Sequence, residues 1–129
     1  MPLHYILANL VANNDRAVGA LFLDDAGETV DLACTDIPPH ELRVAGAYLG
    51  IYLRNLARML VDGEMGPPRV MHIEKGGIHI HVMVLPEGYC LALLQRPPAL
   101  VGQARKTLQA AVEQVRREVF PAEDWGRTG

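Results

Sequence analysis

The strongest pattern in the chain lies between residues 70 and 95, where three apolar segments follow one another with only short turns between them. Valine, isoleucine, leucine and other residues that favour strands fill each segment. A Gly76-Gly77 pair separates the first two segments, and glycine tolerates the positive φ angles that a tight hairpin requires. The pattern predicts an antiparallel meander with strands over residues 70–74, 78–85 and 89–95.

Apolar residues at helical spacing predict three helices outside this meander, and an Asp25-Ala26-Gly27 turn predicts a second hairpin. A long central helix follows Pro38-Pro39 and ends near Val61, because the glycines and prolines beyond it cannot continue a helix. The predicted elements outside the meander are a helix over residues 3–11, strands over 17–24 and 28–34, the central helix, and a third helix that starts at Pro97-Pro98 and runs to Val119.

This order of elements, α-β-β-α-β-β-β-α, predicts an α+β fold with one five-stranded, mostly antiparallel sheet. Helices must cover both faces of such a sheet, which gives a three-layer α/β/α sandwich. The 129 residues suffice for one domain but not for two good cores. We expect a single domain over residues 1–120 and a flexible C-terminal tail over residues 121–129.

The central helix carries more apolar surface than one sheet can bury. Its first apolar stripe consists of Leu42, Ala45, Leu49, Leu53, Leu56 and Leu60, and its second of Val44, Ala47, Tyr48, Ile51 and Tyr52. A helix that is apolar on two sides needs a second burial partner, so we predict contact with another chain. Gly46 and Gly50 would let a second helix approach closely, because glycine has no Cβ atom. The alternative is that these glycines relieve a clash with the chain's own sheet.

Three features of the chain occur together: a hairpin over residues 20–34, a central helix rich in small residues, and a hairpin over residues 70–85 that is followed by a third apolar strand. In this combination and order they resemble the roadblock / dynein light chain superfamily, and in particular its bacterial MglB-type GTPase regulators. The resemblance covers about residues 3–119. Its motifs are patterns of hydrophobicity and turns, and they contain no catalytic signature.

The resemblance implies the strand order 2-1-5-4-3, with the central helix on one face of the sheet and the terminal helices on the other. It implies a homodimer, joined through the central helix and the third strand, that binds a small Ras-like GTPase. No catalytic residue and no cofactor are expected. The residues expected at the dimer interface are Gly46, Gly50, Leu53, Val70, His72 and Glu74. The residues expected to bind the GTPase are Arg43, Ala47, Tyr48, Ile51, Asn55 and Arg58.

Three histidines support an alternative function. The two-glycine turn places His72 opposite His81 and Glu74 opposite His79, on one face of the sheet. Three imidazoles and a carboxylate can bind zinc or another divalent metal, which would make this hairpin a metal- or ligand-binding sensor. The plainer interpretation is a polar face beside the dimer seam, where histidine pairs with glutamate or responds to pH.

Composition and motifs exclude several function classes. A net charge of −3, without a run of Lys or Arg, gives no footprint for nucleic acid or an anionic membrane. The N-terminal segment has no basic region and is interrupted by asparagines, so we expect neither a signal peptide nor a membrane span, and a cytoplasmic location. Cys34 and Cys90 lie in apolar strands, where thiols are inert. No hydrolase, phosphate-loop, dinucleotide or zinc-protease motif occurs, which favours a binding module over an enzyme.

Overall fold

The computed structural model describes residues 2–62 and 69–119, and it contains the helices and strands that the sequence predicts, in the predicted order. A single turn of 3₁₀ helix, η1, separates the last two strands. The elements are α1 (Pro2–Ala12), β1 (Ala17–Leu23), β2 (Thr29–Cys34), α2 (Pro39–Asp62), β3 (Val70–Lys75), β4 (Ile78–Val84), η1 (Pro86–Gly88), β5 (Cys90–Gln95) and α3 (Val101–Val119). The predicted tail over residues 121–129 lies outside the described residues.

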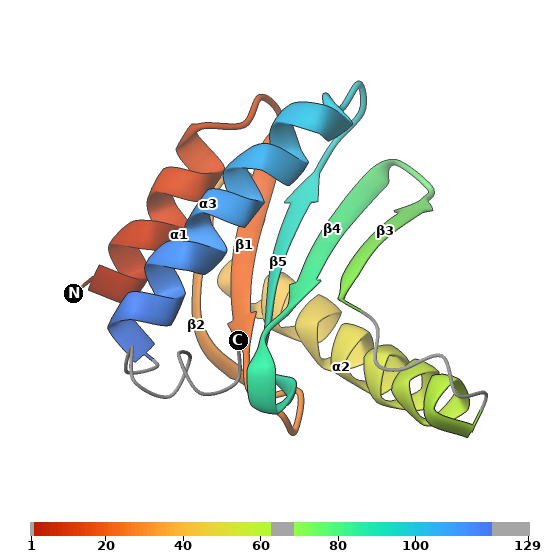
Figure 1. Ribbon diagram of the computed structural model, residues 1–129. Coiled ribbons are helices and arrows are strands. Elements are labelled where there is room, and N and C mark those ends of the chain that lie inside the picture. Colours follow the sequence, from red (N-terminus) through yellow and green to blue (C-terminus); the bar gives the residue numbers. More distant parts are fainter. Residues whose placement is uncertain (1, 63–68, 120–129) are drawn as a thin grey trace.

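The five strands form one sheet in the order β2-β1-β5-β4-β3, and each neighbouring pair is antiparallel. Helices α1 and α3 lie on one face of this sheet, here called the front, and α2 lies on the back (Figure 1). The predicted three-layer α+β sandwich and its strand order are therefore confirmed. Within the described residues, none of the helices is long and apolar enough to cross a membrane.

Alternation of side chains along the strands divides the buried residues into two cores, one for each face. Phe22, Leu91 and Leu93 point to the front, where they pack with the apolar stripes of α1 and α3. Leu21, Leu23 and neighbouring apolar residues point to the back, where they pack with the first apolar stripe of α2. Strands β1 and β5 are buried along their whole length because both of their faces are covered.

The helices do not cover the whole sheet. On the front, α1 packs on β1 and β2, and α3 packs on β5 and β4, so that β3 is left uncovered (Figure 1). On the back, α2 packs mainly on β2 and β1. The back of the β3–β4 hairpin is consequently only partly buried, at Met71, Ile73, Ile78 and Ile80. The half of the sheet that ends in β3 is thus under-covered on both faces.

The two edges of the sheet differ in their protection. On β2, a carboxylate oxygen of Asp31 accepts a hydrogen bond from the backbone N–H of Leu32 at 2.8 Å, and the same oxygen lies 3.5 Å from Nδ1 of His4 on α1. That backbone donor is therefore already occupied. On β3, one side pairs with β4, and no strand of the described chain pairs with the other side. Strand β3 is the open edge, which can serve as a template for another strand.

The two central glycines of α2 lie against the chain's own β-structure. A Cβ atom on Gly46 would come within 3.2 Å of the side chain of Leu23, and one on Gly50 would come within 2.7 Å of the Cα atom of Gly27. Glycine is therefore required at Gly50, where α2 crosses the β1–β2 turn, whereas a methyl group at Gly46 would need only a small shift of the Leu23 side chain. This is the alternative that the sequence leaves open, and it removes both glycines from the surface that a second helix could reach.

We predict that Gly50→Ala lowers the free energy of unfolding by about 1–3 kcal/mol, because the new methyl group meets backbone atoms that cannot move independently. The matched control is Gly102→Ala in α3, where an added Cβ meets no atom within 4 Å and the change should stay within about 0.5 kcal/mol. Urea unfolding followed by circular dichroism measures both values. Equal effects of the two substitutions would contradict the close contact of α2 with the β1–β2 turn.

Candidate functional site

The second apolar stripe of α2 is exposed. Tyr48 retains 71% of its accessible surface, and Ile51 retains 49%. The exposed large apolar side chains on this helix are Val44, Tyr48, Ile51, Tyr52 and Met59. A contiguous apolar face of this kind on one helix indicates a surface that another molecule covers. The prediction that α2 carries apolar surface beyond what its own sheet buries is therefore supported.

The exposed side of α2 divides into two flanks that differ in chemistry. Helical spacing places charged and small residues on one flank, the basic flank, which consists of Arg43, Ala47, Arg54 and Arg58. Large apolar residues occupy the other flank, the apolar flank, which consists of Val44, Tyr48, Tyr52 and Met59. Ile51 lies between the two flanks, and Asn55 lies on the apolar flank. One helix thus presents two exposed surfaces of different chemistry.

The structure separates the residues that the sequence assigns to a dimer interface. Val70, His72 and Glu74 alternate along β3 and share the front face at the open edge of the sheet. Leu53 is partly buried and packs against the chain's own back core, as the two glycines do. The residues that the sequence assigns to GTPase binding are all exposed on α2: Arg43, Ala47, Tyr48, Ile51, Asn55 and Arg58.

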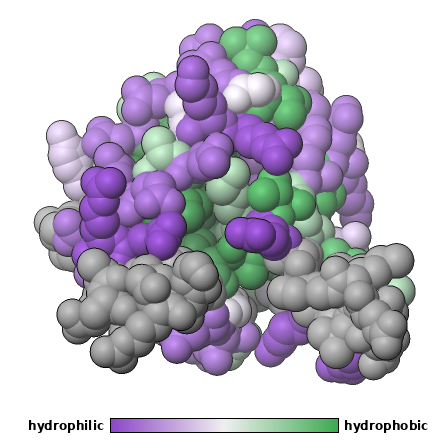
Figure 2. Space-filling view, viewed as in Figure 1, coloured by the Kyte–Doolittle hydropathy of each residue, from purple (hydrophilic) through white to green (hydrophobic). Residues whose placement is uncertain are grey.

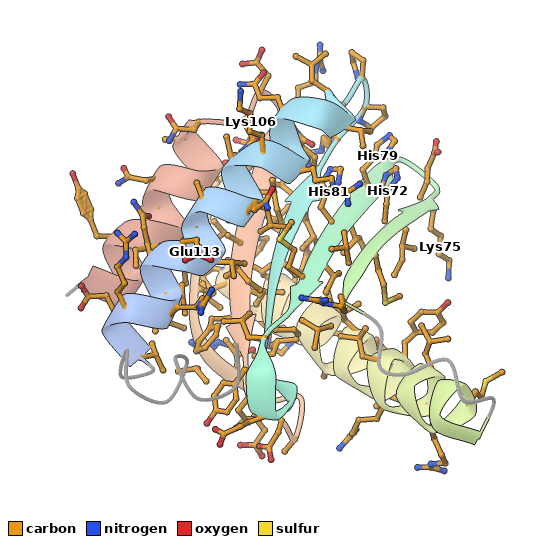
Figure 3. All side chains as sticks on the ribbon, in the orientation of Figure 1. His72, Lys75, His79, His81, Lys106 and Glu113 are labelled. Atoms are coloured by element: carbon orange, nitrogen blue, oxygen red, sulfur yellow. The ribbon has the colours of Figure 1, made fainter. Side chains whose placement is uncertain are left out.

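Three histidines form a stacked cluster on the front of the β3–β4 hairpin, as Figure 3 shows. The predicted register is confirmed, with His72 opposite His81 and Glu74 opposite His79. The ring of His72 lies 4.9 Å from that of His81 and 5.1 Å from that of His79, with nearly parallel planes. His72 Nε2 also lies 2.9 Å from His79 Nδ1, so one of these two nitrogens must carry a hydrogen and donate the hydrogen bond, and the other must accept it.

The innermost ring, His81, is held in place by two consecutive hydrogen bonds, which run through Gln95 to the backbone of Asp15. The side-chain amide of Gln95 donates to the backbone carbonyl of Asp15 at 2.8 Å, which directs its Oε1 atom toward His81 Nε2 at 2.9 Å. Because this oxygen can only accept, His81 carries its proton on Nε2. Burial lowers the pKa of His81, the hydrogen bond to Gln95 opposes this shift, and the nearby His72 and His79 reinforce it. His81 is thus built into the sheet as a neutral imidazole.

The metal-site hypothesis receives no support from this geometry. Among the residues that the structure describes, no three His, Cys, Asp or Glu side chains converge as ligands for a metal ion. His81 Nε2 is engaged with Gln95, and the facing nitrogens of His72 and His79 are engaged with each other. The cluster is a hydrogen-bonded stack in which these nitrogens are already partnered.

A cleft of about 810 Å³ opens at the end of the sheet where the β1–β2 and β4–β5 turns meet α2 and α3. Its lining includes carboxylates at Asp24 and Glu87 and guanidinium groups at Arg54 and Arg69. These opposite charges do not select one sign of ligand. Cys90 also lines the cleft, but burial raises the pKa of its thiol to about 12, which keeps it protonated and unreactive. The cleft therefore offers no activated cysteine.

The structure adds two residues that the sequence does not assign to the candidate surfaces. Met59 extends the apolar flank of α2, and its helical spacing from Tyr48 and Tyr52, which the sequence places in the second apolar stripe, is the corresponding signal. Gln95 supports His81 from β5. A polar residue at the end of an otherwise apolar strand is the corresponding signal in the sequence, although it does not identify the partner.

Comparison with known proteins identifies the fold. No protein-family model matches the sequence, and no curated protein matches it. A roadblock/LC7 domain from Streptomyces avermitilis superposes with a TM-score of 0.81 at 18% identity, covering 92% of this chain and 98% of that one. MglB from Myxococcus xanthus gives 0.79 at 9% identity, over 89% and 92% of the two chains. The gliding protein MglB from Thermus thermophilus gives 0.78 at 15% identity, over 90% and 87%. The chain has a roadblock-type fold that resembles MglB.

We predict that the free energy of unfolding decreases as the pH falls below 6.5, the ordinary pKa of histidine. The folded-state pKa of His81 is lower than that value, so the unfolded chain takes up the proton first. The contribution is complete above pH 6.5 and is lost as the pH falls through the lowered pKa. Urea unfolding at a fixed protein concentration, at about pH 7.5 and about pH 5.5, measures the effect.

His81→Gln should reduce this pH dependence, whereas His40→Gln, at an exposed position in the first turn of α2, should leave it unchanged. A His81→Gln variant with the full dependence of the unaltered chain would contradict the assignment to His81.

Proposed function

We propose that the chain is a homodimeric, non-enzymatic regulator or adaptor that binds a small Ras-like GTPase through the exposed face of α2. The observation that carries this proposal is the apolar face of α2 on a chain whose sheet ends in the open strand β3. The resemblance to MglB-type regulators supplies the class of partner. The roadblock-type fold supports that resemblance.

The unequal edges of the sheet support homodimerisation through β3. Pairing of β3 with β3 of a second copy would satisfy the free backbone groups of the open edge and join the two sheets. The same pairing would bring together the partly buried backs of both β3–β4 hairpins, including Met71 and Ile73. A second copy is the simplest partner that supplies both an open edge and apolar surface, because a two-fold interface uses the same patch on each subunit.

The two flanks of α2 suggest how the surface is shared. The apolar flank, with Tyr52 and with Tyr48, which the sequence assigned to GTPase binding, suits the buried centre of an interface between copies, because tyrosine buries a large ring and keeps a polar tip. The basic flank, with Arg43 and Arg58, suits a partner that is separately soluble, because arginine is enriched in such interfaces and stays solvated when the partner leaves. Ile51, between the flanks, is the apolar anchor that the GTPase would reach.

The exposed arginines of α2 are assigned to docking and not to catalysis. Arg43, Arg54 and Arg58 are exposed on a helix surface. An arginine that stabilises phosphoryl transfer must reach into the partner's site. On the proposed function, the dimer acts by binding and reshaping the GTPase, whose own residues complete the reaction.

We predict that the chain sediments as a dimer and that the double variant Tyr48→Asp/Tyr52→Asp weakens the dimer by at least about hundredfold, because each aspartate would be buried without a partner. The matched control is Val30→Asp on β2, whose side chain is 49% exposed, at the other edge of the sheet. Sedimentation velocity over a concentration series measures the dissociation constants. A monomer at all concentrations, or equal weakening by the control, would refute the assigned interface.

We predict that Ile51→Asp and Arg58→Ala each weaken GTPase binding by about tenfold or more while the dimer persists, because both side chains belong to the exposed docking surface. Each small Ras-like GTPase of the source organism, loaded with a non-hydrolysable GTP analogue, is titrated against the immobilised chain. Arg105→Ala on α3, at the front of the sheet, serves as the control. Unaltered binding of the two α2 variants, or no binding of any GTPase to the unaltered chain, would contradict the proposal.

A further inference from the structure

The histidine cluster on the front of the β3–β4 hairpin has no role in GTPase docking, which uses the back of the sheet. His72 and His79 lie at the margin that α1 and α3 leave uncovered, and the buried His81 lies next to them on the inner side (Figures 1 and 3). Figure 2 shows apolar residues in the middle of this same face. The cluster therefore lies between the solvent-exposed edge of the sheet and an apolar surface. A charge placed there is partly removed from water, so a change of protonation has a large effect on packing.

The hydrogen bond between His72 and His79 requires that at least one of the two facing nitrogens carries no proton. The 2.9 Å contact between His72 Nε2 and His79 Nδ1 therefore cannot form when both rings are protonated. The ring of His72 also stacks at 4.9 Å on the ring of His81, which is 4% exposed. Protonation of more than one ring would place cations about 5 Å apart at the edge of the sheet.

Side-chain alternation along β3 determines which residues of the second copy this cluster would face in a β3-paired dimer. A two-fold axis normal to the sheet keeps the front of one copy beside the front of the other, so even-numbered residues of β3 can face only even-numbered residues. His72 would then face Val70, His72 or Glu74 of the second copy. In each of these registers the two His72 rings are direct or diagonal neighbours, with Cβ atoms about 5–8 Å apart. The histidine clusters of the two copies would then lie side by side across the β3–β3 interface.

We infer that the homodimer is proton-linked: the stacked imidazoles of His72, His79 and His81 line the front of the seam between two copies, and their protonation drives the copies apart. This inference rests on the β3-paired homodimer of the proposed function and adds the regulation of that interface. The partner at this surface is a second copy of the chain, and the ligand that controls it is the proton.

The charges around the cluster do not cancel the positive charge that protonation adds. On β3, Glu74 is 67% exposed and its carboxylate lies 4.0 Å from His79 Nε2, while Lys75 adds a cation at the end of the same strand. From β5 the cluster receives the neutral side chain of Gln95. Helix α3 carries Arg105, Lys106 and Glu113, and none of these is among the groups that shift the pKa of His81. Each protonated cluster would therefore carry an excess of positive charge toward its twin.

Sedimentation velocity of the full chain at about pH 7.5 and about pH 5.5, at constant ionic strength and with a chelator present, tests the inference. We expect the dimer dissociation constant to rise by about ten- to hundredfold at the lower pH, the range for one or two protons taken up on dissociation. The double variant His72→Gln/His79→Gln should retain the dimer at both pH values. The control His4→Gln, near the protected β2 edge, should dissociate as the unaltered chain does.

The outcomes separate this inference from the proposed function. A dimer of equal strength at both pH values, or a double variant that still dissociates at low pH, would overturn proton linkage and leave the homodimer standing. A monomer at about pH 7.5 without chelator would refute the homodimer itself. A dimer that the chelator dissolves would indicate a bridging metal ion and overturn proton linkage. Loss of the far-ultraviolet circular dichroism signal at about pH 5.5 would reduce the effect to unfolding and overturn it as well.

Discussion

A mismatch between the width of the sheet and the cover that its helices provide governs this structure. Five strands lie side by side, but the three described helices pack on β2, β1, β5 and part of β4. Apolar residues on the back of the β3–β4 hairpin and on the outer side of α2 therefore remain accessible to water. Because burial of apolar surface is the main stabilising contribution to a fold, a chain of this size that leaves so much of it uncovered is suited to association.

The same mismatch leaves α2 with an inner and an outer side of different roles in the fold. Its inner side is committed to the sheet, where Gly46 and Gly50 permit close approach to β1 and the β1–β2 turn. Its outer side keeps an apolar flank and a basic flank, and exposure to solvent is unfavourable for the first but not for the second. A permanent interface and an intermittent one can then occupy neighbouring surfaces of a single helix.

Most of the fold could be predicted from the sequence because local rules determine it. The two-glycine turn fixes the register of His72 opposite His81, and the two stripes of α2 follow from helical periodicity. The position of Gly50 could not be predicted in the same way, because glycine indicates a close approach without showing which surface approaches. The two hydrogen bonds that link Asp15 through Gln95 to His81 join residues far apart in the chain, so only the folded sheet reveals them.

The protection of β2 has a consequence for the size of any assembly. A sheet with two free edges can add copies at both ends and grow without limit, as in fibrils. Here the carboxylate of Asp31 accepts a hydrogen bond from the N–H of Leu32, which removes one backbone donor of the β2 edge from pairing with another strand. The side chain of Asp31 thus makes β2 a poorer template for a further strand than an edge whose donors are all available.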